Sequence, residues 1–325
     1  MLSRRLALAL GASLTLAAGL AGARAAEVDT ITLDWAYYNP VSLVMKQEGW
    51  LEQELAADGI EVRWVQSLGS NKALEFLNAG SLDFGSSAGA AALLAKINGN
   101  PIESVWIYSK PEWTALVTRP DTGIAKVEDL KGKRIAVTKG TDPFIFLLRA
   151  LSAHGLTAQD VDLVLLQHDQ GRLALVRGDV DAWAGLDPMM ADVELSEGYP
   201  LFYRDADANS YGVLNVREEF AVEHPELVQR VLTVYERGRQ WALDNPEALA
   251  KLLAEAAKLP EPVAAKQLER TGFVDPVPGD AERETITAAG TALQGAGIIK
   301  PDVDVAAVVD SLLQPSFATA VIPGQ

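Results

Sequence analysis

Four turns in this chain join a short apolar run to a segment with the pattern of a helix start. A helix N-terminus presents N–H groups without intrahelical partners at the positive end of its dipole, so it binds anions. Ligands of open α/β sheets bind outside the carboxyl ends of the strands. Four such turns around one cleft therefore predict a site for a small anion. The turns are Tyr37-Tyr38-Asn39-Pro40, Gly85-Ser86-Ser87, Gly140-Thr141-Asp142-Pro143 and Gly185-Leu186-Asp187-Pro188.

Acidic and aromatic residues near the turns could bind a second kind of ligand group. Trp183 ends the apolar run before the fourth turn, and Lys110-Pro111-Glu112-Trp113 puts an acid and an indole at the expected cleft rim. Glu112, Asp142 and Asp187 would repel an anion, or would instead receive an ammonium group. Aromatic rings nearby also favour a cation. The pattern therefore leaves an amine-bearing or zwitterionic ligand open.

Several of these residues also have a purely structural interpretation. Asn39, Asp142 and Asp187 each precede a proline, and Asn or Asp followed by proline is a common helix cap that needs no ligand. Trp183 fits the core of a sheet as well as a cleft. The hydroxyls of a Gly-Ser-Ser turn at a strand end are the candidates for which a ligand role is favoured over a structural one.

The stretch Gly85-Ser86-Ser87-Ala88-Gly89 also matches the G-x-S-x-G pattern of a hydrolase nucleophile. A hydrolase needs a histidine base that is oriented by an acid. Ser87, Asp187 and His224 occur along the chain in the order nucleophile, acid and base. Nothing else in the sequence supports it. We expect no enzymatic activity, no cofactor and no metal, because three scattered histidines and no cysteine make a poor zinc site.

The first 25 residues have the pattern of a cleaved secretory signal. Arg4 and Arg5 precede an apolar stretch, and Ala23-Arg24-Ala25 fits the small-x-small cleavage rule. We therefore expect a protein of the periplasm. Cleavage removes three arginines and no acidic residue, which moves the net charge from −16 to −19. So acidic a protein is not expected to bind nucleic acid, and anion binding must come from local dipoles.

The remaining residues alternate between strand-like and helix-like stretches, which predicts βαβ units around two mostly parallel sheets. The polar turn Arg119–Gly123 is expected to be the first crossing between domains, and Tyr211–Val216 the return strand. The predicted division is 26–118 plus 212–325 for one lobe and 119–211 for the other. Two crossover strands permit hinge closure over a ligand between the lobes. Expected strands are Ile31–Trp35, Ile60–Gln66, Leu82–Phe84, Ile102–Tyr108, Thr114–Thr118, Arg134–Val137, Val161–Leu166, Asp181–Ala184 and Leu201–Tyr203. Expected helices are Ser42–Leu55, Asn71–Asn78, Ala88–Ile97, Phe144–His154 and Gly171–Arg177, followed by a helical segment from Glu218 onward.

Four blocks of the sequence resemble the periplasmic aliphatic sulfonate-binding proteins, within the wider nitrate, sulfonate and taurine binding group. They are Asp34–Val44 with Gly49-Trp50-Leu51, Leu74–Gly85, Asp129–Thr141 with Phe146–Leu151, and Gly178–Ala184 with Asp187-Pro188. Their order and spacing follow the family over most of the chain. The resemblance implies the two-lobed type II periplasmic binding protein fold and the role of a substrate-binding subunit.

The resemblance also implies which residues bind and which partners take part. The ligand would be a sulfonate-type small molecule. The partners would be a permease in the inner membrane and a separate ATPase chain, with the binding protein itself a monomer. Carried across by motif, the binding residues are Tyr37, Tyr38, Asn39, Ser86, Ser87, Gly140, Thr141, Asp142, Trp183 and Asp187, beside Glu112 and Trp113 from the crossing.

Overall fold

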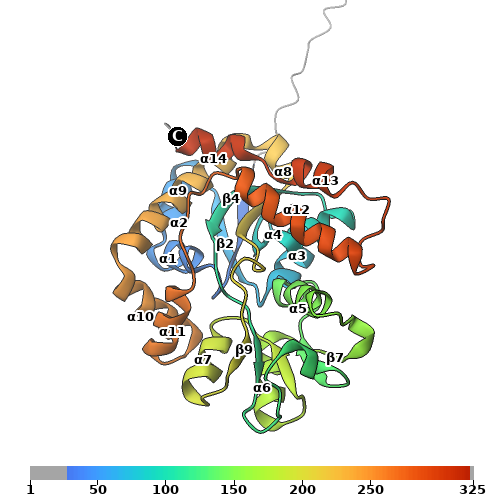
Figure 1. Ribbon diagram of the computed structural model, residues 1–325. Coiled ribbons are helices and arrows are strands. Elements are labelled where there is room, and N and C mark those ends of the chain that lie inside the picture. Colours follow the sequence, from blue (N-terminus) through green and yellow to red (C-terminus); the bar gives the residue numbers. More distant parts are fainter. Residues whose placement is uncertain (1–27, 323–325) are drawn as a thin grey trace, which may run out of the picture.

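The computed structural model describes residues 28–322 and contains two separate β-sheets, each covered by helices (Figure 1). We call the first sheet with its helices lobe 1 and the second sheet with its helices lobe 2. The expected signal peptide lies outside the described residues. Within 28–322, no helix combines the length and apolarity needed to cross a membrane.

The sheet of lobe 1 has the strand order β2-β1-β3-β10-β4. Strands β1, β2 and β3 are parallel, and β10 is antiparallel to both of its neighbours, so four of the five strands share one direction. The strands are β1 (Thr30–Trp35), β2 (Glu61–Gln66), β3 (Phe84–Ala88), β4 (Ile102–Ser109) and β10 (Gly212–Arg217).

The sheet of lobe 2 has the order β7-β6-β8-β5-β9, and here β5 is the single antiparallel strand. The antiparallel strand of each sheet is thus the first one formed after the chain crosses between lobes. The strands are β5 (Leu116–Thr118), β6 (Arg134–Val137), β7 (Asp162–Leu165), β8 (Ala182–Ala184) and β9 (Leu201–Tyr203).

Helices cover both sheets, and those from the C-terminal third return to lobe 1 (Figure 1). Lobe 1 contains α1 (Pro40–Glu48), α2 (Trp50–Leu55), α3 (Ser70–Asn78), α4 (Gly89–Ile97), α8 (Glu218–Glu223), α9 (Pro225–Asp244), α10 (Pro246–Ala257), α11 (Glu261–Glu269), α12 (Asp280–Gly295), α13 (Val305–Leu312) and α14 (Pro315–Val321). Lobe 2 contains α5 (Asp142–Ala153), α6 (His168–Arg177) and α7 (Met189–Ser196). Short 3-10 turns occur at Ala56–Asp58, Val127–Leu130 and Ala158–Asp160.

Three sequence expectations need correction. The expected helix Ser42–Leu55 is two helices, because Gly49 has a left-handed φ of 62° that ends α1 and begins α2. The outgoing crossing precedes Leu116 rather than falling at Arg119–Gly123, because β5 already pairs with β8 and β9. The Gly85-Ser86-Ser87 segment is strand β3 and not a turn, because β10 pairs with it along its whole length.

The two lobes touch beyond the crossing segments. Helix α11 of lobe 1 packs against α7 of lobe 2, and α5 of lobe 2 packs against α4 and α12 of lobe 1 (Figure 1). Within lobe 2, Trp183 and Leu175 belong to a small apolar core of their own. The lobes therefore meet in a closed arrangement, and their facing strand ends form the boundary described next.

Candidate functional site

A cavity of about 260 Å³ lies at the boundary between the lobes. Two much smaller hollows, one beside Trp113 and one beside Thr141, share the ring of Tyr38 with it. Tyr38 therefore lines all three of these hollows. Lobe 1 contributes Tyr37, Tyr38, Gln66, Ser67 and Leu68 to the cavity, and lobe 2 contributes His168, Asp169, Leu186, Asp187, Pro188 and Met189.

Three helix N-termini, from both lobes, meet at this boundary. Gly69, which precedes α3, lies so close to the first residue of α6 that a Cβ placed on it would be 2.9 Å from Nε2 of His168. Gly140, just before α5, lies against Asn71 of α3, and Ser70 and Thr141 line the same hollow. None of these three helices has a side-chain cap on its first turn. Their N–H groups and dipoles make the boundary favourable for an anion.

On the lobe 1 side, the buried carboxylate of Asp34 organises the wall behind the cavity. It accepts hydrogen bonds from Oγ of Ser67 at 2.5 Å and from both N and Oγ of Ser86 at 2.8 Å. The hydroxyl of Tyr38 lies 2.9 Å from Oγ of Ser67 and 3.1 Å from the carbonyl oxygen of Ser86. Burial raises the pKa of Asp34 to about 6, against the opposing effect of these hydrogen bonds.

The two serines proposed from sequence lie inside the sheet rather than on the cavity wall. Ser86 also accepts a hydrogen bond from Nδ2 of Asn39 at 2.8 Å, and Ser87 accepts one from Nδ2 of Asn215 at 2.8 Å. Ser87 donates its own proton to the carbonyl of Ala88. Their hydroxyls are satisfied by lobe 1 itself, because successive side chains of β3 point into its two packed faces. Among residues 28–322, no histidine hydrogen-bonds Ser87, so the hydrolase triad is not assembled.

Trp113 and Asp142 join the two crossing segments. Nε1 of Trp113, on the outgoing segment, donates to Oδ2 of Asp142 at 2.8 Å. The N–H and hydroxyl of Ser210, on the returning segment, donate to the same carboxylate at 2.9 Å. Burial raises the pKa of Asp142 despite these hydrogen bonds. Thr141 donates to the carbonyl of Thr138, which fixes the turn before α5.

Asp187, at the lobe boundary, has one carboxylate oxygen that accepts no hydrogen bond. Its Oδ1 accepts from the N–H of Ala191 at 2.9 Å and lies 3.5 Å from Nη1 of Arg270, whereas Oδ2 has no partner. Arg270 comes from the end of α11 and also pairs with Glu194 of α7. Burial raises the pKa of Asp187 to about 7, and Arg270 opposes the rise. Glu112 is instead paired with Arg204, which holds the pKa of that carboxyl below its ordinary value.

Of the two remaining aromatic candidates, one lines the cavity and the other is buried in the core of lobe 2. Tyr37 is half-buried, lines the cavity and donates its hydroxyl proton to the carbonyl of Ala256. Trp183 is fully buried in the lobe 2 core against Gly171, where a Cβ would lie 2.7 Å from the indole nitrogen. The expected cleft role of Trp183 is therefore replaced by packing, because its position in β8 turns the indole toward α6.

Three of the boundary residues that were not sequence candidates, Asp34, His168 and Arg270, show what sequence reasoning could and could not find. Asp34 is an acid within an apolar strand, and His168 lies just after the end of a strand, at the start of a helix. Both positions can be recognised from the local sequence, so a closer look at the strand ends would have identified them as candidates. Arg270 carries none. It reaches the site only because α11 packs against α7.

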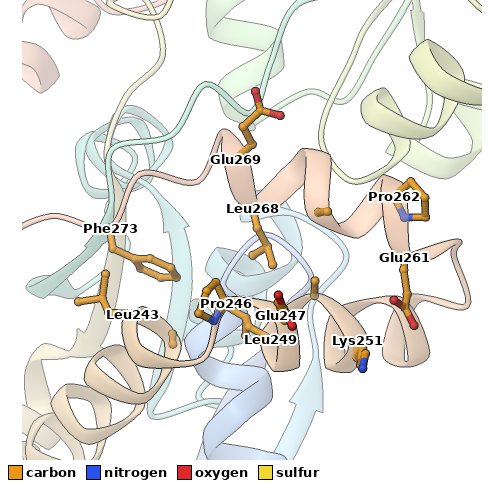
Figure 2. A pocket seen from close by; sticks show the side chains of 13 residues that line it. Leu243, Pro246, Glu247, Leu249, Lys251, Glu261, Pro262, Leu268, Glu269 and Phe273 are labelled. Atoms are coloured by element: carbon orange, nitrogen blue, oxygen red, sulfur yellow. The ribbon is translucent and has the colours of Figure 1, made fainter.

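A larger hollow of about 870 Å³ lies on the outer side of lobe 1, between α10 and α11 (Figure 2). Figure 2 shows Leu268 and Phe273 directed toward Pro246 at the start of α10. Its walls are mostly apolar, and polar groups from the two lobes do not converge there as they do at Tyr38. Within 28–322, no cluster of three or more acidic or histidine side chains has an arrangement suited to a metal ion.

Two α/β lobes, joined by two crossing segments and enclosing a cavity at their facing strand ends, define the class of two-lobed periplasmic binding proteins. The model of the family described as NMT1/THI5 like matches residues 41–249. The chain belongs to this family.

Individual relatives agree with this assignment. A Bacillus subtilis protein named as an aliphatic sulfonates-binding protein is 29% identical over 250 residues, which cover 75% of each chain. The alkanesulfonate-binding protein of Xanthomonas axonopodis pv. citri, solved bound to MOPS, is 25% identical with a TM-score of 0.79, over 87% of this chain and 99% of that one. The periplasmic aliphatic sulphonate binding protein of Escherichia coli is 25% identical with a TM-score of 0.75, over 88% and 92%.

Proposed function

We propose that this chain is the periplasmic substrate-binding subunit of an ABC importer and captures an aliphatic sulfonate between its lobes. The observation that carries the proposal is the meeting of three helix N-termini from both lobes at the lobe boundary: α6 begins at the cavity, and α3 and α5 begin at the small hollow that shares Tyr38 and Leu186 with it. A sulfonate has three acceptor oxygens and no proton, so it needs N–H and O–H donors to replace its water shell. The names of the similar proteins support the same ligand class.

Binding would act through closure of the lobes. A ligand that contacts both walls favours the closed state by its differential affinity for that state. The permease and a separate ATPase chain would then distinguish the closed, loaded protein from the open one. No catalytic step is needed, and the satisfied hydroxyl of Ser87 supports a binding role rather than a hydrolytic one. Export through the expected signal peptide would bring the protein to the periplasm.

A thermal-shift screen of the purified protein tests the proposal. The panel contains alkanesulfonates of increasing length, sulfate and nitrate. A ligand at 100 times its dissociation constant adds about 2.7 kcal/mol of stability, so alkanesulfonates are expected to raise the melting temperature clearly. A shift with sulfate or nitrate alone, or with no member of the panel, would contradict the proposal.

The variant Gly69→Ala tests whether the ligand lies between the lobes. A Cβ on Gly69 would meet Nε2 of His168 in lobe 2 and Oδ1 of Asn71 in its own lobe at 2.9 Å, so the closed arrangement becomes crowded, and the φ of 156° adds a strain at the start of α3 that is measured separately as the melting temperature without ligand. We expect sulfonate affinity to fall at least about tenfold, because the binding-competent fraction falls. The matched control is Gly279→Ala, where the nearest atom to a Cβ is 3.4 Å away and belongs to a flexible side chain of lobe 1. Equal affinities of the two variants would place the ligand elsewhere.

A further inference from the structure

Arg270 links the two lobes through charge. It directly follows α11 of lobe 1, which lies above α7 of lobe 2 in Figure 1, and its side chain is 5% exposed. Nη2 donates to the carboxylate of Glu194 on α7, and Nη1 lies 3.5 Å from Oδ1 of Asp187, just before that helix. In the part of the chain that the structure describes, no other ion pair joins lobe 1 directly to lobe 2. One cation from lobe 1 thus faces two acids from lobe 2.

The lobe 1 end of this link is fixed at two points. Gln267, one turn earlier on α11, donates from Nε2 to the carbonyl oxygen of Tyr37 at 2.5 Å, and Tyr37 lines the cavity from lobe 1. The carbonyl oxygen of Arg270 accepts from the N–H of Glu112 at 2.9 Å, on the outgoing crossing segment. The arginine therefore stays with lobe 1 and the crossing segment when lobe 2 rotates away, and the rotation must separate it from its two acids.

Burial makes the charges of this link depend on one another. The side chain of Asp187 is 1% exposed and that of Glu194 is 27% exposed, so the closed arrangement removes most of their hydration. The neighbouring Arg204 is already paired with Glu112. Loss of one member of a buried pair leaves the charge of its partner uncompensated, whereas an open cleft lets water reach that charge. Without Arg270, closure would therefore place the carboxylate of Glu194 between the lobes with no countercharge.

We propose that Arg270 is a latch that holds lobe 2 in the closed arrangement through Glu194 and Asp187, and that it maintains a closed population before a ligand adds its own contacts. The inference goes beyond the proposed function, because it concerns the balance between closed and open protein and not what the cavity binds. A ligand of any class would gain apparent affinity from the latch, since a larger fraction of the protein is already in the competent arrangement.

Distances between the lobes, measured without ligand by double electron–electron resonance, test the latch. The chain contains no cysteine, so spin labels can be attached at Glu75→Cys on α3 of lobe 1 and Gln170→Cys on α6 of lobe 2, both at exposed positions. We expect a closed and an open distance in the labelled protein, and Arg270→Gln should lower the ratio of closed to open at least about tenfold. The latch is overturned if the labelled protein with Arg270 has no closed population, or if Arg270→Gln leaves the ratio unchanged. Neither outcome depends on which ligand binds, so the sulfonate function stands or fails separately.

Further variants separate a latch from an arginine that only packs. Glu194→Gln added to Arg270→Gln removes the carboxylate that lost its countercharge, so the ratio should recover to within about threefold of the original. Arg270→Lys keeps the charge without the planar fork and should fall between the two, and it decides the question if Arg270→Gln does not fold. The matched control is Arg172→Gln, because Arg172 of α6 pairs with Asp192 of the same helix α7 but within lobe 2. It should lower the melting temperature and leave the ratio unchanged. Equal opening in the control, or no recovery with Glu194→Gln, would make Arg270 a packing residue.

Discussion

Asp142 and Asp187 stand in nearly identical local surroundings and have different partners. Each precedes a proline, and each follows a strand of the same sheet, β6 or β8, which are neighbours. The carboxylate of Asp142 receives three hydrogen bonds from the two crossing segments. The carboxylate of Asp187 receives one from its own helix and leaves an oxygen free beside the cavity. The comparison teaches that the dipeptide predicts a helix start, whereas the neighbours decide whether the acid holds the fold or remains available to a ligand.

The largest effect is expected from Asp142→Ala. The substitution leaves the N–H groups of Trp113 and Ser210 buried without acceptors, so the free energy of unfolding should fall by about 3 kcal/mol. Urea denaturation measures it. Asp187→Asn at pH 5 is the comparison and should cost less than about 1 kcal/mol, because Asp187 is already protonated below its pKa of about 7 and Asn keeps an oxygen for the N–H of Ala191. Similar losses in the two variants would contradict the distinction.

A smaller effect is expected from the pH dependence of Asp187. Its folded-state pKa of about 7 lies above the value of about 3.9 for an unfolded chain, so the native state holds a proton that the unfolded state gives up. Its contribution to stability is therefore present below pH 4 and lost as the pH rises toward 7. Relative to the unsubstituted protein, Asp187→Asn should gain about 2 kcal/mol between pH 5 and pH 7. Denaturation curves at both pH values measure this. A pH-independent difference between the two proteins would show that Asp187 titrates normally.

The opposite sign applies to the pH dependence of His168, which lines the cavity from the same lobe as Asp187. Its folded-state pKa of about 3 lies below that of an unfolded histidine, so its contribution is present above pH 6.5 and lost as the pH falls. Comparing Asp187→Asn with the unsubstituted protein separates the two groups, because His168 is common to both.

The smallest effect is expected from Glu112→Gln. Glu112 pairs with Arg204, but the arginine side chain is 49% exposed. An ion pair of this kind contributes less than about 1 kcal/mol and is screened by salt. The loss of melting temperature should therefore be small at low ionic strength and vanish at about 0.5 M salt. A loss as large as that of Asp142→Ala would mean that Glu112 belongs with the buried acids.

Part of the site was predictable because its signals are local. The apolar runs and the turns after them predicted β1, β6 and β8 and the helix starts that follow, since strand and helix periodicity can be read within about ten residues. The same approach failed at Ser86 and Ser87. A Gly-Ser-Ser segment has the composition of a turn, and only pairing with β10, more than 120 residues later, makes it the middle of a strand.

The sequence by itself determined the two α/β lobes, the order of their elements and the family, because these follow from periodicity, caps and motif spacing along the chain. Only the tertiary structure decided which polar groups remain unpartnered. Trp183 is covered by α6, Asp142 is taken by the crossing segments, and Asp187 keeps an oxygen free although Arg270 arrives from α11. Whether a buried polar atom is satisfied depends on neighbours brought from far along the chain, and no local pattern contains that information.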